Sequence, residues 1–127
     1  MEEQTNIGNL AIGTKETEKQ KLKPAKVKIV NYLIEQVEKA KSNKVKFECE
    51  HPDKDEHIFI SSASCLSNKQ VITTGTWLNY DDDGLIVKQS QLATLMRFLG
   101  ANTLNETKDK FCDTELDDKG YLCFKAY

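Results

Sequence analysis

Two cysteines and two histidines lie near one another in the middle of the chain: Cys49, His51, His57 and Cys65. Thiolate and imidazole are the ligands that zinc prefers in tetrahedral sites, where paired ligands are usually separated by two to four residues on a tight turn. Here Cys49 and His51 are expected to share one face of an extended strand instead. We therefore expect a buried Cys49, two histidines flanking the charged surface loop of residues 53–56, and no metal site.

Aspartates gather in two loops, residues 81–84 (Asp-Asp-Asp-Gly) and 117–120 (Asp-Asp-Lys-Gly). Clustered carboxylates attract Ca²⁺ or Mg²⁺, but calcium loops of the EF-hand type alternate their ligands and close with a distant Glu. Neither loop has that pattern, and Asp-Gly is favourable hairpin chemistry. Both loops are therefore predicted to be turns without a metal.

Covalent catalysis needs a nucleophile, a base and a group that orients the base. The only candidates are a cysteine with His51 or His57, and the chain has no nucleophile elbow, no Gly-rich phosphate loop and no helix-borne His pair. We expect a protein that is not an enzyme and that has no cofactor. The four cysteines are predicted to be reduced core residues, with a Cys112–Cys123 disulfide across a terminal hairpin as the alternative.

Lysines and aromatic residues supply the remaining chemistry. Lysines alternate with apolar residues in two tetrads, 26–29 and 44–47, which would form a basic strip if the tetrads pair. Aromatic rings, including Tyr121, would offer faces on which unpaired bases stack. The alternative is that these lysines are ordinary solvent-facing residues and that the aromatics belong to the core. The predicted nucleic-acid-binding residues are Lys26, Lys28, Lys44, Lys46, Trp77 and Tyr80.

The composition narrows the functional classes. Hydrophobic residues make up 39% of the chain, charged residues 30%, and the net charge is -2. This balance argues against a duplex-binding domain, which is typically strongly basic, but permits a local basic strip. No apolar stretch approaches the roughly 20 residues that cross a bilayer, and the acidic start of the chain is not a secretory signal. We expect a cytoplasmic protein with no membrane partner.

Two parts of the chain differ in composition. Residues 1–23 are rich in Glu, Lys, Gln and Thr and contain few apolar residues, so they cannot bury enough surface to offset the entropy of ordering. They are predicted to form a disordered, charged tail. Residues 24–127 are predicted to form a single domain.

Residues 26–40 are compatible with two secondary structures. Apolar residues between Ile29 and Val37 fall at helical spacing. Strict alternation in the two lysine tetrads, on either side of the turn-like residues 41–43, favours paired strands instead, the first with a bulge near Asn31. We predict the strands.

The remaining pattern is mainly β. Strands are expected at residues 45–50, 58–60 and 70–80, with a turn at 83–84 leading into residues 85–87. A helix is expected between an N-cap at Ser90 and a left-handed Gly100, and strands at 111–116 and 121–126 form a terminal hairpin. The prediction is an α+β fold: a small, partly open β-barrel with one helix before the final β-hairpin.

This order resembles the oligonucleotide/oligosaccharide-binding (OB) fold, in which a helix precedes the last two strands. The resemblance covers residues 24–127. The chain is also similar to small archaeal and phage-type OB-like proteins in three short motifs: Ser90-x-Leu92, Phe98-Leu99-Gly100 and Gly120-Tyr121-Leu122. An extra strand departs from the five-stranded plan. The resemblance implies a non-enzymatic binder of single-stranded DNA or RNA. The alternative is a protein-interaction module, such as an adaptor or small inhibitor from a virus or mobile element.

Overall fold

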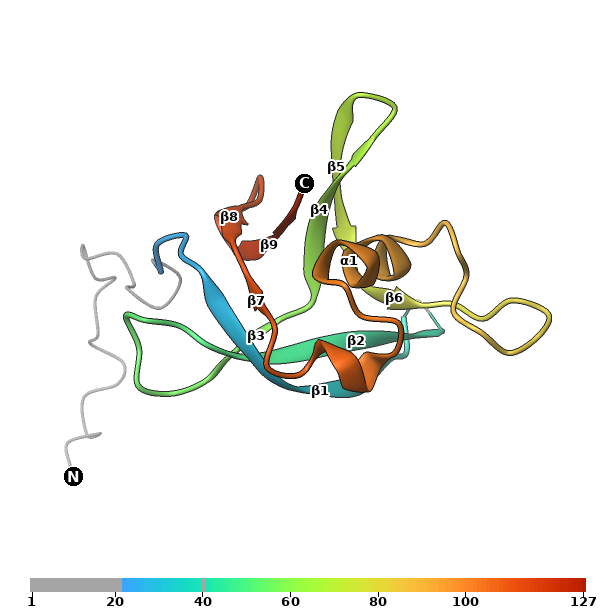
Figure 1. Cartoon of the computed structure of the whole chain (residues 1–127), viewed down its shortest axis with the longest axis horizontal. Coiled ribbons are helices and arrows are strands. Elements are labelled where there is room, and N and C mark those ends of the chain that lie inside the picture. The colour runs from blue at the N-terminus through green and yellow to red at the C-terminus, as the bar shows by residue number, and fades with distance from the viewer. Residues whose placement is uncertain (1–21, 40) are drawn as a thin grey trace, which may run out of the picture.

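A computed structural model describes residues 22–39 and 41–127, so the predicted tail lies outside the described residues except for Leu22 and Lys23. The described chain is mostly β-structure (Figure 1). Its elements are β1 (Val27–Val37), β2 (Ser42–Glu50), β3 (Ile58–Ile60), β4 (Ser62–Ser67), β5 (Gln70–Gly75), β6 (Trp77–Leu78), α1 (Gln91–Leu99), the 3₁₀ helix η2 (Leu104–Thr107), β7 (Phe111–Cys112), β8 (Thr114–Leu116) and β9 (Leu122–Ala126).

Apart from Lys26, which precedes β1, the lysine tetrads lie on strands as predicted, and β1 and β2 form an antiparallel hairpin. The pairing register shifts between Ile29 and Asn31, which confirms the predicted bulge. The turn, however, shares only Lys41 with the predicted residues 41–43, because Val37 pairs with Ser42. This register determines which residues of β1 and β2 face each other.

The strands form two sheets that join at three corners. The first sheet has the order β3-β2-β1-β7, with β6 also paired to β2, and the second has the order β5-β4-β9-β8. Single residues, Ser61, Thr76 and Asp113, separate β3 from β4, β5 from β6 and β7 from β8, so the chain passes directly from one sheet to the other at these residues. The result is a small, partly open barrel, as predicted.

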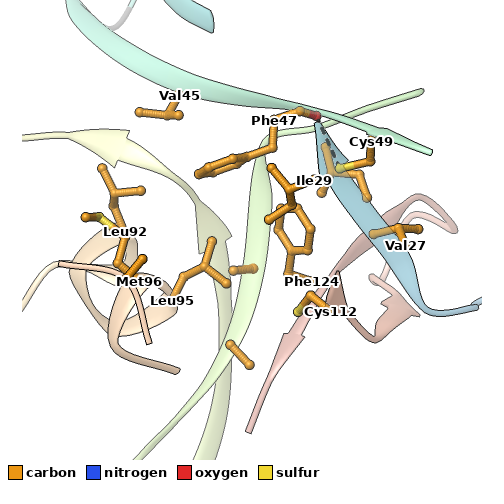
Figure 2. Close-up of a cluster of buried hydrophobic side chains, with 14 of the residues drawn as sticks. Val27, Ile29, Val45, Phe47, Cys49, Leu92, Leu95, Met96, Cys112 and Phe124 are labelled. Carbon is orange, nitrogen blue, oxygen red and sulfur yellow. Dashed lines mark hydrogen bonds between the residues drawn. The ribbon is translucent and has the colours of Figure 1, made fainter. Parts of the chain in front are cut away.

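The core fills the space between the two sheets and beneath α1 (Figure 2). Phe47 of β2 and Phe124 of β9 meet edge to face, with ring centroids 5.5 Å apart. Leu92, Leu95 and Met96 of α1 close one side of the cluster. Because side chains alternate along a strand, each residue that β2 sends into this core has a neighbour on the opposite face of the sheet.

Helix α1 is defined by the caps that the sequence predicts. The Ser90 hydroxyl accepts a hydrogen bond from the backbone N–H of Ala93 at 3.1 Å, and Gly100 has φ 78°, a left-handed conformation that favours glycine. The Gln91 side-chain amide donates to the carbonyls of Ala63 and Ile72. These bonds attach the start of the helix to β4 and β5.

Four predictions about strands were wrong. Residues 111–116 form two short strands rather than one, because Asp113 separates β7, which pairs with β1, from β8, which pairs with β9. Residues 70–80 form two strands, because Thr76 turns the chain from β5, which pairs with β4, to β6, which pairs with β2. Residues 85–87 form no strand and contribute only a bridge between Ile86 and Tyr80. Strand β4 was not predicted, since its small serines have weak β-propensity. Within residues 22–39 and 41–127, no helix is long and apolar enough to cross a membrane.

Candidate nucleic-acid interface

The side of the first sheet that points away from the core carries both lysines and aromatic rings. Strand β2 buries Val45, Phe47 and Cys49, so the residues that alternate with them face outward. Antiparallel partners lie on the same face, and Trp77 is opposite Lys44, Phe59 opposite Glu48, and Phe111 opposite Lys28. We call this surface the outer face. It consists of Lys28, Leu33, Glu35, Lys44, Lys46, Glu48, Glu50, Phe59, Trp77 and Phe111.

Two lysines of the outer face lie over aromatic rings. The Lys44 Nζ is 4.9 Å from the centroid of the Trp77 ring, and the Lys46 Nζ is 5.0 Å from that of Phe59. Gly75 makes room for the first pair, because a Cβ there would lie 2.5 Å from Lys44 Cε. The rings therefore present their faces to cations, the geometry of a cation–π contact.

The six predicted site residues separate into three groups. Lys28, Lys44, Lys46 and Trp77 share the outer face. Lys26 precedes β1 and lines a shallow hollow with Lys28 and Phe111 at one end of that face. Tyr80 does not join them, because it follows β6 into the next loop and lies in a separate groove beside Leu78.

The lysine tetrads do not pair with each other, and the predicted basic strip is therefore wrong in its register. Since the turn lies before Ser42, Lys44 pairs with Glu35 and Lys28 pairs with Glu50. The outer face thus interleaves three lysines with three glutamates. Local charge is nearly balanced rather than strongly positive.

Two exposed rings on this surface were missed by the sequence analysis. Phe59 is 49% exposed and Phe111 is 59% exposed. Residues 58–60 read as a uniform apolar run, yet Ile60 is buried while Phe59 points outward. The period of two along a strand was the signal that would have identified Phe59.

A histidine contacts the two outward glutamates of β2. The His57 Nδ1 lies 2.6 Å from a Glu48 carboxylate oxygen, and its Nε2 lies 3.6 Å from Glu50. The hydrogen bond to Glu48, together with the negative charges of Glu48 and Glu50, raises the pKa of His57. Protonated His57 neutralises part of the acidic end of the outer face.

The residues considered for zinc are dispersed. Cys49 lies in the core, while His57 is at the surface with Glu48. His51 is buried, contrary to the expected surface position, because its Nε2–H donates to the Lys23 carbonyl at 2.8 Å and its Nδ1 accepts from the Asp53 N–H at 3.0 Å. Among the residues that the structure describes, no group of three or more His, Cys, Asp or Glu is placed to hold a metal ion.

The four cysteines are free, buried thiols. Burial raises the pKa of Cys49 and of Cys112 to about 12, so neither forms a thiolate readily near neutral pH. The terminal hairpin does not pair Cys112 with Cys123, since Cys112 is opposite Val27 and Cys123 is opposite Glu115. These thiols are packing groups in this fold.

The two aspartate loops have the same pattern of hydrogen bonds. Asp81 Oδ1 accepts hydrogen bonds from the N–H groups of Asp83 and Leu85, both at 2.9 Å. Asp117 Oδ1 likewise accepts from Lys119 and Tyr121, both at 2.9 Å. The first carboxylate of each loop is therefore occupied by its own turn.

The outer face thus combines partly exposed aromatic rings with ammonium groups. Comparison of the chain with protein-family models, curated proteins and solved structures finds no match.

Proposed function

We propose that this protein binds single-stranded DNA or RNA on the outer face. Bases stack on Trp77 and Phe59, and Lys44 and Lys46 contact the phosphates. The observation that carries the proposal is the pair of ring-covering lysines, at 4.9 Å and 5.0 Å from the ring centroids. Stacking platforms beside cations are what sequence-tolerant single-strand binders use.

A bound base would take the place of the lysine over each ring. The displaced ammonium group then lies next to the base, where the nucleotide's phosphate is within reach of its flexible stem. Stacking on an aromatic side chain contributes about 1–3 kcal/mol per base. Two platforms on neighbouring strands accommodate two bases of one strand.

The architecture supports the same surface by analogy. In OB folds, the face of the second and third strands binds oligonucleotides. Here β2 supplies Lys44 and Lys46, and β3 supplies Phe59. Lys44, Lys46 and Phe59 are the residues through which the OB-fold analogy supports binding on the outer face.

The carboxylates on the outer face shape the expected affinity. Glu48 and Glu50 repel phosphates from the end where His57 lies, so the strand follows the end with Lys44, Lys46 and Trp77. Each phosphate neutralised on a single strand changes the slope of log K against log salt by about -0.7. With two or three such contacts, the expected slope is about -2, far shallower than that of a strongly basic binder.

The first experiment uses the chain's single tryptophan as a reporter. Titration with fluorescein-labelled oligo-dT and oligo-U of 15 nucleotides is expected to raise anisotropy and quench Trp77 fluorescence at the same concentrations. The double variant Lys44→Gln/Lys46→Gln should weaken binding about tenfold or more. The matched control Lys69→Gln/Lys119→Gln removes the same charge from exposed turn positions and should bind like the original chain.

The outcome decides the proposal directly. No anisotropy change at 100 µM protein and low salt would remove nucleic-acid binding as the function. Binding without quenching of Trp77, or equal weakening by both double variants, would show that the outer face is not the site.

A further inference from the structure

A second concave surface lies at the mouth of the barrel, on the opposite side of the first sheet from the outer face. It has a volume of about 760 Å³ and lies between the far end of the β1–β2 hairpin, the loop from β6 to α1, and the end of α1. Leu78, Ala93 and Met96 form its floor. We call it the mouth groove. Its volume is in the range of ligand-binding clefts, about 300–1,000 Å³.

Large apolar side chains surround the mouth groove yet remain open to solvent. Ile34 is 46% exposed, Tyr80 is 61% exposed and Leu85 is 64% exposed. Single exposed apolar residues are ordinary. Three large apolar side chains around one cavity with an apolar floor form a patch of the kind that marks a binding site, because burying the patch under a ligand is favourable.

The charges at the groove are of one sign. Its lining includes Lys88 and Arg97 and contains no Asp or Glu, although the chain as a whole has more acidic than basic residues. Arg97 is the only arginine of the chain, and its guanidinium donates one bond, 3.3 Å long, to the Thr94 hydroxyl. In the described part of the chain, neither Lys88 nor Arg97 forms an ion pair.

Acidic residues in the loop before Gly84, Asp81–Asp83, and Glu106 on η2 are not part of the lining. Asp81, in the loop beside the groove, accepts two hydrogen bonds from its own turn. Glu106 on η2 accepts a bond of 2.7 Å from the backbone N–H of Asn102. The two cations of the groove therefore face solvent without a counter-charge from the lining.

We propose that the mouth groove binds a short acidic and apolar peptide segment of a partner protein. Leucine-like or aromatic side chains of the segment enter the groove over Met96, and its carboxylates pair with Arg97 and Lys88. An arginine guanidinium matches a carboxylate with two parallel hydrogen bonds. Charge complementarity therefore selects an acidic segment over a basic or neutral one.

Peptide selection tests the chemistry of the occupant. A random heptapeptide library is selected on the full chain and counter-selected on the charge-reversed variant Lys88→Glu/Arg97→Glu. The matched control is Lys54→Glu/Lys119→Glu, which makes the same change in charge at exposed positions away from the groove. Peptides that distinguish the first pair should combine Asp or Glu with Leu, Ile or Phe and should bind the control variant normally.

The site is then located with an enriched peptide. Methyl signals of Ile34, Leu85 and Met96 should shift on titration, and Arg97→Gln should weaken binding about tenfold. The proposal is overturned if no peptide distinguishes the charge-reversed variant, if the distinguishing peptides lack carboxylates, or if the shifts map elsewhere. Because these residues lie off the outer face, quenching of Trp77 by oligonucleotides is a separate readout.

One competing occupant belongs to the chain itself. Residues 1–12 also combine acidic and apolar side chains, including Glu2, Glu3, Ile7 and Leu10. In the full chain without peptide, Leu10→Ser should leave the methyl signals of the groove unchanged. If the signals of Ile34, Leu85 and Met96 move together in that variant, the occupant is this segment and the proposal of an external partner is overturned.

Discussion

The two sides of the first sheet present cations in opposite states. On the outer face, Lys28 forms an ion pair with Asp109 at 3.8 Å, and Lys44 and Lys46 cover aromatic rings. In the mouth groove, Lys88 and Arg97 have no acidic neighbour in the lining. The same strand serves both, since β1 places Leu33 outward and Ile34 at the groove. Whether the cations of a surface already have partners therefore says more about which ligands the surface can take than the number of cations does.

The two ends of β1 differ in a related way. Val27 and Ile29 are fully buried in the core, whereas Leu33 and Ile34, beyond the bulge, are each 46% exposed. One end of the hairpin stabilises the barrel, and the other extends past the core and exposes apolar side chains. The inward and outward faces of the sheet should accordingly respond to mutation with very different energies.

The largest expected effect compares two phenylalanines from opposite faces of the sheet. Phe47→Ala removes a fully buried ring that packs on Phe124 and should lower the free energy of unfolding by about 3–5 kcal/mol. Phe59 lies on the outer face, opposite Glu48, the residue that follows Phe47. Phe59→Ala should lower the free energy of unfolding by less than about 1 kcal/mol. Urea unfolding followed by circular dichroism measures both. Similar losses would contradict the division between core and outer face.

A smaller loss of stability is expected from removing the buried hydrogen bond that positions Trp77 on the outer face. The buried Thr76 hydroxyl donates a 2.6 Å hydrogen bond to the Val45 carbonyl and holds the start of β6 against β2. Thr76→Val should cost about 1 kcal/mol and should shift the Trp77 emission spectrum, because Trp77 follows directly. The exposed Thr74→Val is the control and should change neither. An unchanged Trp77 spectrum in Thr76→Val would show that this bond does not position the ring.

The smallest effect concerns His57, whose pKa is raised by its hydrogen bond to Glu48. A raised pKa in the folded state means that the stabilisation is complete below the unfolded value of about 6.5 and is lost as the pH rises through the folded value. The stability advantage of the original chain over His57→Gln should therefore be larger at pH 6 than at pH 9. Proton NMR titration should show the pKa of His57 falling in Glu48→Gln. A pKa that does not change in that variant would contradict the assignment of Glu48 as the main cause.

Local hydrogen bonding explains which elements could be predicted. The caps at Ser90 and Gly100 and the turns begun by Asp81 and Asp117 involve groups within five residues of one another. The alternation of side chains along a strand likewise shows which residues of that strand lie on the same face as one another. These features need no knowledge of the rest of the chain.

The candidate sites depended on distant pairings that no local pattern specifies. Because the hairpin turn ends before Ser42, Lys44 lies opposite Glu35. His51, expected at the surface, is buried and donates a hydrogen bond to the distant Lys23 carbonyl. Trp77 reached Lys44 only because Thr76 transfers the chain from β5 to β2.

The sequence by itself determined the β-rich barrel with one capped helix, because periodicity, caps and turns are short-range properties of the chain. Only the tertiary structure decided that Phe59 and Trp77 share a face with Lys44 and Lys46, and that Arg97 borders an apolar groove. Strand register and cavities arise where segments far apart in sequence meet, and the free energy that selects them comes from packing the whole core at once.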